Sequence, residues 1–179
     1  MLEELLRLIS ALPGRSPAPT LPARLGQLFR LLAFEPAASA EAIEERIWAL
    51  WMYHPHRAAA LALERATGDI AAQRYDIAET RLALLLRSRP DFPEAWNKRA
   101  TLYYLQQRDE ECLADIRRTL ELEPRHFGAL AGLGEIWLGR GELEGALLAF
   151  RSALRLNPHL KEVASACERI AAGPGRTAH

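Results

Sequence analysis

The sequence predicts an all-α fold, a right-handed α-solenoid in which helical hairpins stack side by side. Pro90, Pro124 and Pro158 stand 34 residues apart, and each follows an apolar stretch of helical periodicity that it cannot continue. A period near 34 residues with two helices per unit is typical of a solenoid. Ala, Leu, Glu and Arg dominate the 179 residues and β-branched residues are scarce, which favours helix.

Composition excludes several classes of protein. Hydrophobic residues make up 49% of the chain and charged residues 26%, as in globular proteins. Lys plus Arg (23) equals Asp plus Glu (23), so the basic surface of a nucleic-acid-binding protein is not expected. No apolar run reaches the ~18 residues that a membrane-spanning helix needs, so we expect no integral membrane segment. The two cysteines, Cys112 and Cys167, fit a reducing compartment.

Residues 1–22 predict a short helix and a proline-rich linker. Apolar residues recur at helical spacing over residues 2–12, and prolines follow at positions 13, 17, 19 and 22. We expect this helix to dock loosely or fray; the alternative is a helix for self-association or surface anchoring.

Residues 23–58 predict a degenerate helical hairpin. One helix is expected over residues 23–34, and a second carries Trp48 and Trp51 before His54 and Pro55 close it. We expect this hairpin to cap the N-terminal side of the array.

Residues 59–172 predict three regular units, 59–92, 93–126 and 127–160, and a capping helix over about 160–172. Short turns make the two helices of each unit antiparallel. The eighth position of each unit is small, as a tight helix crossing requires: Ala66, Ala100 and Gly134. The expected helices cover residues 59–72, 76–88, 93–106, 109–122, 127–140 and 143–156. The tail, 173–179, is rich in Gly and expected to be disordered.

These residues resemble the tetratricopeptide repeat (TPR) family, most clearly in the third unit with Leu133-Gly134, Trp137, Ala146 and Phe150. Segments 93–101 and 122–130 are similar to a group of bacterial TPR proteins, some of which carry export signals. The sequence as written predicts a cytoplasmic protein, and the resemblance implies a periplasmic one if an upstream signal peptide was removed. It also implies that the first helices of the units line a concave surface that binds peptides or protein segments.

The positions that would face this surface are Glu64, Thr67, Asn97, Lys98, Thr101, Tyr104, Glu135 and Leu138. Asn97, Thr101 and Tyr104 share one helix face, and an Asn amide can pair with the backbone of an extended peptide. The family's carboxylate clamp uses Lys and Asn at the fifth and ninth positions. Those positions here do not match it, although a carboxylate could still meet Lys98. The alternative is a solvated groove with no fixed ligand.

Arg65 and Arg99 occupy a position that is normally apolar and buried. Because a buried guanidinium needs an anionic or carbonyl partner, Asp69 and Asp115 are the candidates for an internal ion pair. The alternative is that these arginines reach a ligand carboxylate.

No pattern for catalysis, a metal or a cofactor stands out. The sequence has no phosphate loop, nucleophile elbow or HExxH motif, and its five histidines lack partners at ligand spacing. Cys112 falls at a packing position and is expected in the core. We therefore expect a non-enzymatic protein–protein interaction scaffold with a protein or peptide partner. The alternative is self-assembly into a homo-oligomer through Leu2–Leu12 or the helix with Trp48 and Trp51.

Overall fold

The computed structural model describes residues 1–173, and the expected disorder of 174–179 lies outside that range. All the elements in the described part are helical. They are α1 (Leu2–Ala11), a 3-10 turn (Leu12–Gly14), α2 (Arg24–Phe34), α3 (Ala37–Met52), α4 (Arg57–Ala71), α5 (Tyr75–Ser88), α6 (Pro93–Leu105), α7 (Asp109–Leu122), α8 (Phe127–Gly139), α9 (Leu143–Leu156) and α10 (Lys161–Ala172). The helices of the three regular units lie within two residues of the expected ranges.

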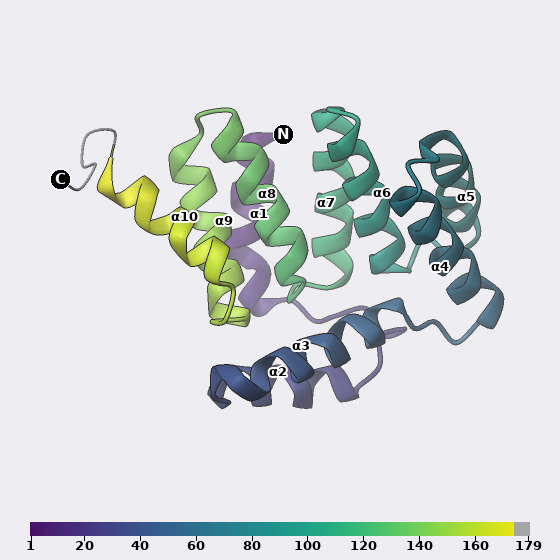
Figure 1. The fold of residues 1–179 in the computed structure, drawn as a ribbon, viewed down its shortest axis with the longest axis horizontal. Coiled ribbons are helices and arrows are strands. Elements are labelled where there is room, and N and C mark those ends of the chain that lie inside the picture. Colours follow the sequence, from purple (N-terminus) through teal and green to yellow (C-terminus); the bar gives the residue numbers. More distant parts are fainter. Residues whose placement is uncertain (174–179) are drawn as a thin grey trace.

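Three antiparallel hairpins, α4–α5, α6–α7 and α8–α9, stand side by side, and α10 follows at the C-terminal end (Figure 1). Small residues allow the paired helices to approach closely. Ala66, Ala78 and Ala146 are completely buried. A Cβ atom placed on Gly134 would lie 2.3 Å from the Phe150 ring, so only glycine fits this crossing.

The turns inside the three hairpins share one backbone conformation. Gln73, Gln107 and Gly141 occupy equivalent positions, and all three have positive φ angles of 57°, 59° and 76°. Glycine adopts this left-handed conformation at no steric cost, whereas the two glutamines do not. The 34-residue period is therefore a property of the backbone as well as of the side chains.

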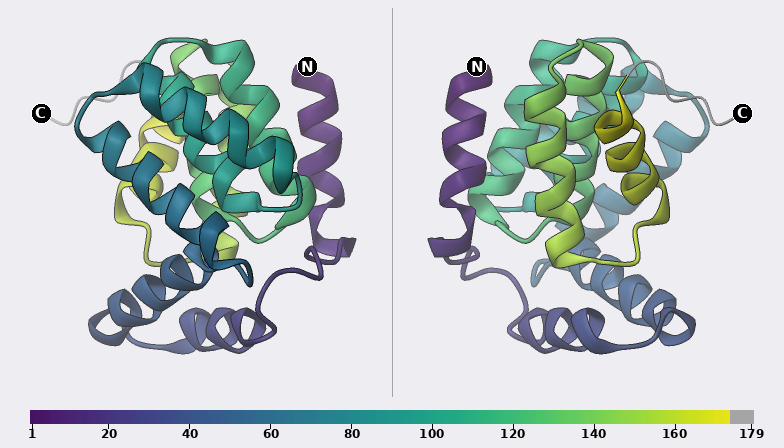
Figure 2. Two further views of the ribbon diagram at one scale, coloured as in Figure 1. Left: turned by 90° about the vertical axis from the view of Figure 1, so that its right-hand side faces the viewer. Right: turned by 90° about the vertical axis from the view of Figure 1, so that its left-hand side faces the viewer.

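Helix α1 packs firmly on the outer side of the array, against α7 and α9 (Figure 2). Leu5 is 0% exposed and Ile9 is 1% exposed, so the apolar face of the helix is sealed. The expectation of a loosely docked or frayed helix is wrong, because the outer helices offer α1 a complementary apolar surface. Self-association through this face would require α1 to leave its site.

The α2–α3 hairpin runs across the loops that join the units, residues 89–92, 123–126 and 157–160, which we call the inter-unit edge (Figures 1 and 2). The Trp51 ring stacks on His126 at 4.0 Å between centroids, and the Asn157 amide donates to Glu44 at 2.8 Å. The expectation that this hairpin caps the N-terminal side of the array is therefore wrong. The physical reason is that Trp51 of this hairpin packs against residues of the inter-unit edge and not against the outer face of α4–α5.

Candidate functional site

A groove opens between the first helices of the second and third units, α6 and α8, and contains a cavity of about 140 Å³. We call it the α6/α8 groove. Most of its wall is apolar or small, and Glu135 is the charged residue that lines it. The lining residues are Asn97, Ala100, Thr101, Tyr104, Cys112, Ile116, Gly128, Ala129, Gly132, Glu135 and Ile136.

Three of the predicted surface residues, Thr101, Tyr104 and Glu135, line this groove with exposed side chains. Tyr104 is 49% exposed. Its ring offers a large contact area and its hydroxyl a hydrogen bond, a combination typical of interfaces. Glu135 forms no ion pair within residues 1–173. The Thr101 hydroxyl donates to the Asn97 carbonyl at 3.0 Å within α6, so the Tyr104 hydroxyl and the Glu135 carboxylate are the polar groups that stay available for a partner.

Asn97 and Lys98, by contrast, are engaged within the protein. Asn97 is only 8% exposed, and its amide donates to Glu94 Oε1 at 3.3 Å. The Lys98 ammonium lies 3.1 Å from the same oxygen and 5.6 Å from the centre of the Trp48 ring. Glu94 thus uses the polar groups that the sequence suggested for a ligand.

The Glu94 carboxylate is fully buried and links the second unit to the third. His126 Nε2 lies 2.8 Å from Glu94 Oε2, while His126 Nδ1 accepts the N–H of Ala129 and caps α8. Because Nδ1 accepts, Nε2 carries the proton that is donated to Glu94. Burial raises the pKa of Glu94, but the His126 hydrogen bond and the Lys98 charge outweigh it and hold this pKa below its usual value.

The α2–α3 hairpin closes one end of the α6/α8 groove. Trp48 packs on Gly128 so tightly that a Cβ atom there would lie 2.6 Å from the indole ring. Trp48 also meets the rings of His126 and Phe127 edge-on. The N-terminal hairpin therefore forms an end wall of the groove and leaves its remaining length open.

The other predicted surface residues lie outside the cavity wall. Glu64 is exposed on α4, and the Thr67 hydroxyl donates to the Leu63 carbonyl at 3.0 Å. Leu138 is partly buried and packs against the main core. The structure brings Asn97, Thr101, Tyr104 and Glu135 together on the groove wall. Glu64, Thr67 and Leu138 lie apart from them.

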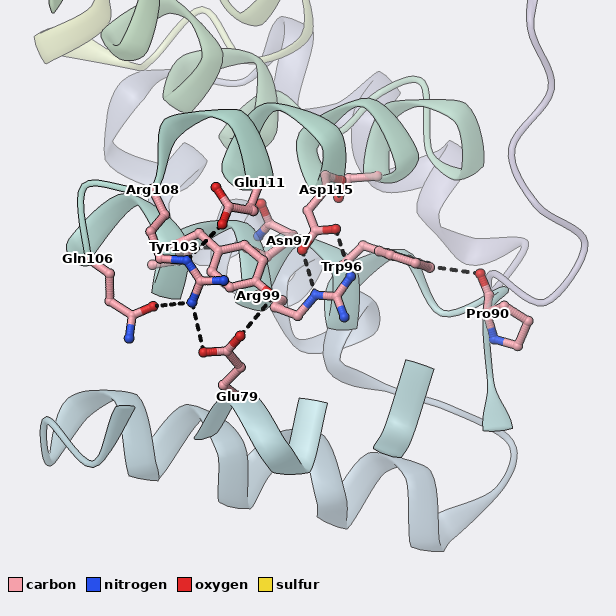
Figure 3. A network of polar contacts seen from close by, with 12 residues as sticks. Glu79, Pro90, Trp96, Asn97, Arg99, Tyr103, Gln106, Arg108, Glu111 and Asp115 are labelled. Carbon is pink, nitrogen blue, oxygen red and sulfur yellow. Dashed lines mark hydrogen bonds and ion pairs between the residues drawn. The ribbon is translucent and has the colours of Figure 1, made fainter. Parts of the chain in front are cut away.

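Arg99 and Arg65 have different environments. The Arg99 guanidinium makes two hydrogen bonds to Asp115, at 2.7 and 2.9 Å, as expected for a paired buried charge (Figure 3). Arg65 is exposed, and Asp69 instead binds Arg74 and Arg81. The expected pairing of Arg65 with Asp69 is therefore wrong, because the turn and α5 supply nearer guanidinium groups.

A second part of this network joins the first unit to the second. Glu79 on α5 accepts from the Tyr103 hydroxyl at 3.2 Å and pairs with Arg108 at 2.9 Å (Figure 3). The Arg108 guanidinium lies 4.2 Å from the centre of the Tyr103 ring. These contacts lie where α5 meets α6 and the turn that follows α6, and none of their residues lines the α6/α8 groove. They therefore stabilise the packing of the first unit on the second and do not contribute to the groove.

Cys112 contributes to the floor of the groove. Its side chain is 2% exposed, and burial raises the pKa of the thiol to about 12. A neutral buried thiol behaves as a small apolar group, which agrees with the expected core role. The floor is therefore apolar at neutral pH.

Sequence reasoning missed Gly128 and Gly132, which shape the groove from α8. A Cβ atom on Gly132 would meet no other atom within 4 Å, so no internal packing demands glycine there. Glycine in a helix costs about 0.5–1 kcal/mol relative to alanine. The glycine content of residues 127–139 is the sequence signal from which a close approach on this helix could have been predicted.

Comparison with known proteins identifies the repeats. The tetratricopeptide repeat profile matches residues 63–111 and 113–160, more than half of the chain. The chain belongs to the tetratricopeptide repeat family. A TPR repeat-containing protein of Rhizobium etli is 32% identical over 136 residues, which cover 75% of this chain and 67% of that protein.

Two further similarities are shorter or more distant. Superkiller complex protein 3 of Homo sapiens is 34% identical over 64 residues, 36% of this chain and 4% of that protein. The first TPR domain of Spaghetti (RPAP3), solved with the HSP90 peptide SRMEEVD, matches with a TM-score of 0.60 and 19% identity. That match covers 64% of this chain and 90% of the domain, and it shows the shared fold.

Within residues 1–173, none of the TPR protein's helices has the length and apolar character needed to cross a bilayer.

Proposed function

We propose that this TPR protein is a non-enzymatic interaction scaffold that binds a segment of a partner protein in the α6/α8 groove. The observation that carries the proposal is an apolar cavity that opens to solvent between two first helices, with Tyr104 and Thr101 on its rim. Binding sites in proteins are typically concave, mostly apolar and fitted with a few polar groups. The likeness to a TPR domain solved with a peptide supports this class of partner.

The rigid surroundings of the groove favour binding by a preformed surface. Glu94, His126 and Lys98 fix the start of α6 to the start of α8, and Trp48 closes the end of the groove. A site that does not need to be ordered on binding loses less conformational entropy when its partner docks. The N-terminal hairpin is thus proposed to support the groove and not to fill it.

Two substitutions on α6 test this site with a matched control. Tyr104 and Leu105 are neighbours with 49% and 48% exposure, but only Tyr104 lines the groove. We expect Tyr104→Ala to lower recovery of a specific partner about tenfold, because an interface aromatic contributes on the order of 1–2 kcal/mol. Leu105→Ala should retain wild-type recovery.

The first measurement is affinity capture from an extract of the producing cells with wild type, Tyr104→Ala and Leu105→Ala, quantified by mass spectrometry. The second is a titration of each of these three proteins with the purified partner. If every partner is retained equally by Tyr104→Ala and by wild type, the proposed groove is not the binding site.

A further inference from the structure

We infer that the α6/α8 groove selects a basic partner segment, in which a branched aliphatic side chain enters the cavity beside Gly132 and an adjacent Lys or Arg contacts Glu135. This inference rests on the proposed function and specifies its ligand. Two independent features carry it, the empty space above Gly132 and the unpaired carboxylate at the rim.

The space beside Gly132 has the size and surface of a site for one apolar group. The cavity measures about 140 Å³, and its floor is made by Ala100, Cys112 and Ile136. A dry apolar cavity of about 150 Å³ in a protein interior binds benzene, so a cavity of similar size holds a Leu or Ile side chain. The missing Cβ of Gly132 leaves the backbone of α8 open to such a group.

The charge at the groove favours a cation. Glu135 is exposed and forms no ion pair within the described residues, whereas the ammonium of Lys98 on α6 is already paired with Glu94. Glu135 also stands at the ninth position of its unit, where the carboxylate clamp has an amide. A peptide carboxylate placed here would meet a like charge, while a Lys or Arg side chain would be attracted.

The hairpin sets where that charge can lie relative to the apolar group. Trp48 covers Gly128 and closes the groove on that side. Gly132 and Glu135 follow on the open side of α8, three residues apart and therefore on the same face of the helix. The basic residue must consequently lie toward Glu135 and Tyr104.

The experiment is an NMR titration of the ¹⁵N-labelled full chain with three capped peptides, acetyl-Gly-Leu-Lys-Gly-amide, acetyl-Gly-Leu-Glu-Gly-amide and acetyl-Gly-Gly-Lys-Gly-amide. We expect the Leu-Lys peptide to shift the Gly128, Gly132 and Tyr104 amide signals, with millimolar affinity at least about threefold tighter than either other peptide, at low ionic strength where surface charges act. Glu135→Gln should remove the preference for Lys over Glu. Gly132→Leu should remove the effect of the peptide Leu, whereas Gly68→Leu on α4, also in open space, should not.

Equal affinity for the Lys and Glu peptides, a Leu that adds nothing, or no shift of these three amides at 10 mM peptide (about ten times a millimolar Kd) would each overturn the inference. The proposed function fails separately. If the peptides leave the groove unchanged but a captured partner still depends on Tyr104, the groove binds a partner of different chemistry. If the peptides bind as expected and partner capture ignores Tyr104, the partner uses another surface.

Discussion

The first and third units share one backbone plan but differ in their neighbours. The α8–α9 hairpin is covered by α7, α10, α1 and α2, and its residues belong to the main core together with those of the N-terminal helices. The α4–α5 hairpin has a separate, smaller core and contacts mainly α6. On its outer side Leu61, Ile77 and Leu84 remain 39%, 48% and 53% exposed.

This difference in covering predicts that units with the same backbone have unequal stability. In a repeat array each unit is stabilised by its own packing and by its neighbours, so a unit with one neighbour unfolds first. The N-terminal hairpin could have covered the first unit but lies on the inter-unit edge, where it supports the second and third units. The α6/α8 groove is thus placed in the best supported part of the molecule.

The largest effect should come from removing the aromatic anchor of the N-terminal hairpin. Trp51 is 0% exposed, stacks on His126 and donates to Glu123 at 3.5 Å. Trp51→Ala should lower the free energy of unfolding by about 3–5 kcal/mol, because it leaves a cavity in the main core. The measurement is urea unfolding, with Tyr53→Ala as the control; Tyr53 is 54% exposed and should cost less than about 0.5 kcal/mol. Equal losses for the two variants would contradict a docked hairpin.

The next effect concerns the buried carboxylate between the second and third units. Glu94→Gln should cost about 1–3 kcal/mol at pH 7, because Lys98 loses its counter-charge and the hydrogen bonds weaken. The folded-state pKa of Glu94 lies below its ordinary value of 4.5, so its contribution is complete above that pH. That contribution is lost as the pH falls through the folded-state pKa.

Unfolding free energies measured from pH 7 down to pH 3 should therefore fall more steeply for wild type than for Glu94→Gln. Parallel curves would show that this carboxylate does not gain its stabilisation from His126 and Lys98.

Two glycines allow one substitution to act in opposite directions in the two units. Gly134→Ala places a methyl group against Phe150 in the third unit and should cost about 1–3 kcal/mol. Gly68→Ala meets no atom within 4 Å on α4 and should stabilise its helix by about 0.5–1 kcal/mol. Hydrogen exchange resolved by helix provides the measurement. A destabilised first unit in Gly68→Ala would contradict the open surroundings of α4.

The smallest effect should come from the polar junction between the first and second units. Arg108→Ala removes the pair with Glu79 and the contact with Tyr103. Amide exchange in α4 and α5 should accelerate about threefold, while exchange in α8 and α9 stays at the wild-type rate. Faster exchange throughout the chain would indicate that the two cores unfold together.

The helices of the array could be predicted from sequence because local signals determine them. Prolines, small residues and turn residues recur with the 34-residue period, and the positions of Asn97, Thr101, Tyr104 and Glu135 in the units placed these four residues on the groove wall. The docking of α2–α3 could not be predicted in this way. Trp48 and Trp51 were visibly apolar, but periodicity does not say whether a neighbouring hairpin or an inter-unit edge will cover them.

The polar contacts were harder to predict for a related reason. Asn97 and Lys98 occupy surface positions by register. The buried carboxylate of Glu94 nevertheless binds both side chains, accepting a hydrogen bond from Asn97 and pairing with the Lys98 ammonium. Glu123 and Asn157 occupy equivalent loop positions, and both are fully buried and hold a residue of the hairpin, Trp51 and Glu44 respectively. The pairings of Glu123 and Asn157 depend on distant parts of the chain, and Glu94 itself is held by His126, 32 residues away. A local pattern does not record such contacts.

The most direct test of the groove is hydrogen exchange of the full chain with and without a purified partner identified by capture. Binding in the α6/α8 groove should protect amides in residues 97–104 of α6 and 128–136 of α8, and leave α1 and α9 unchanged. Protection confined to α1 and α9, or to the open outer side of α4–α5, would contradict the groove as the site of partner binding.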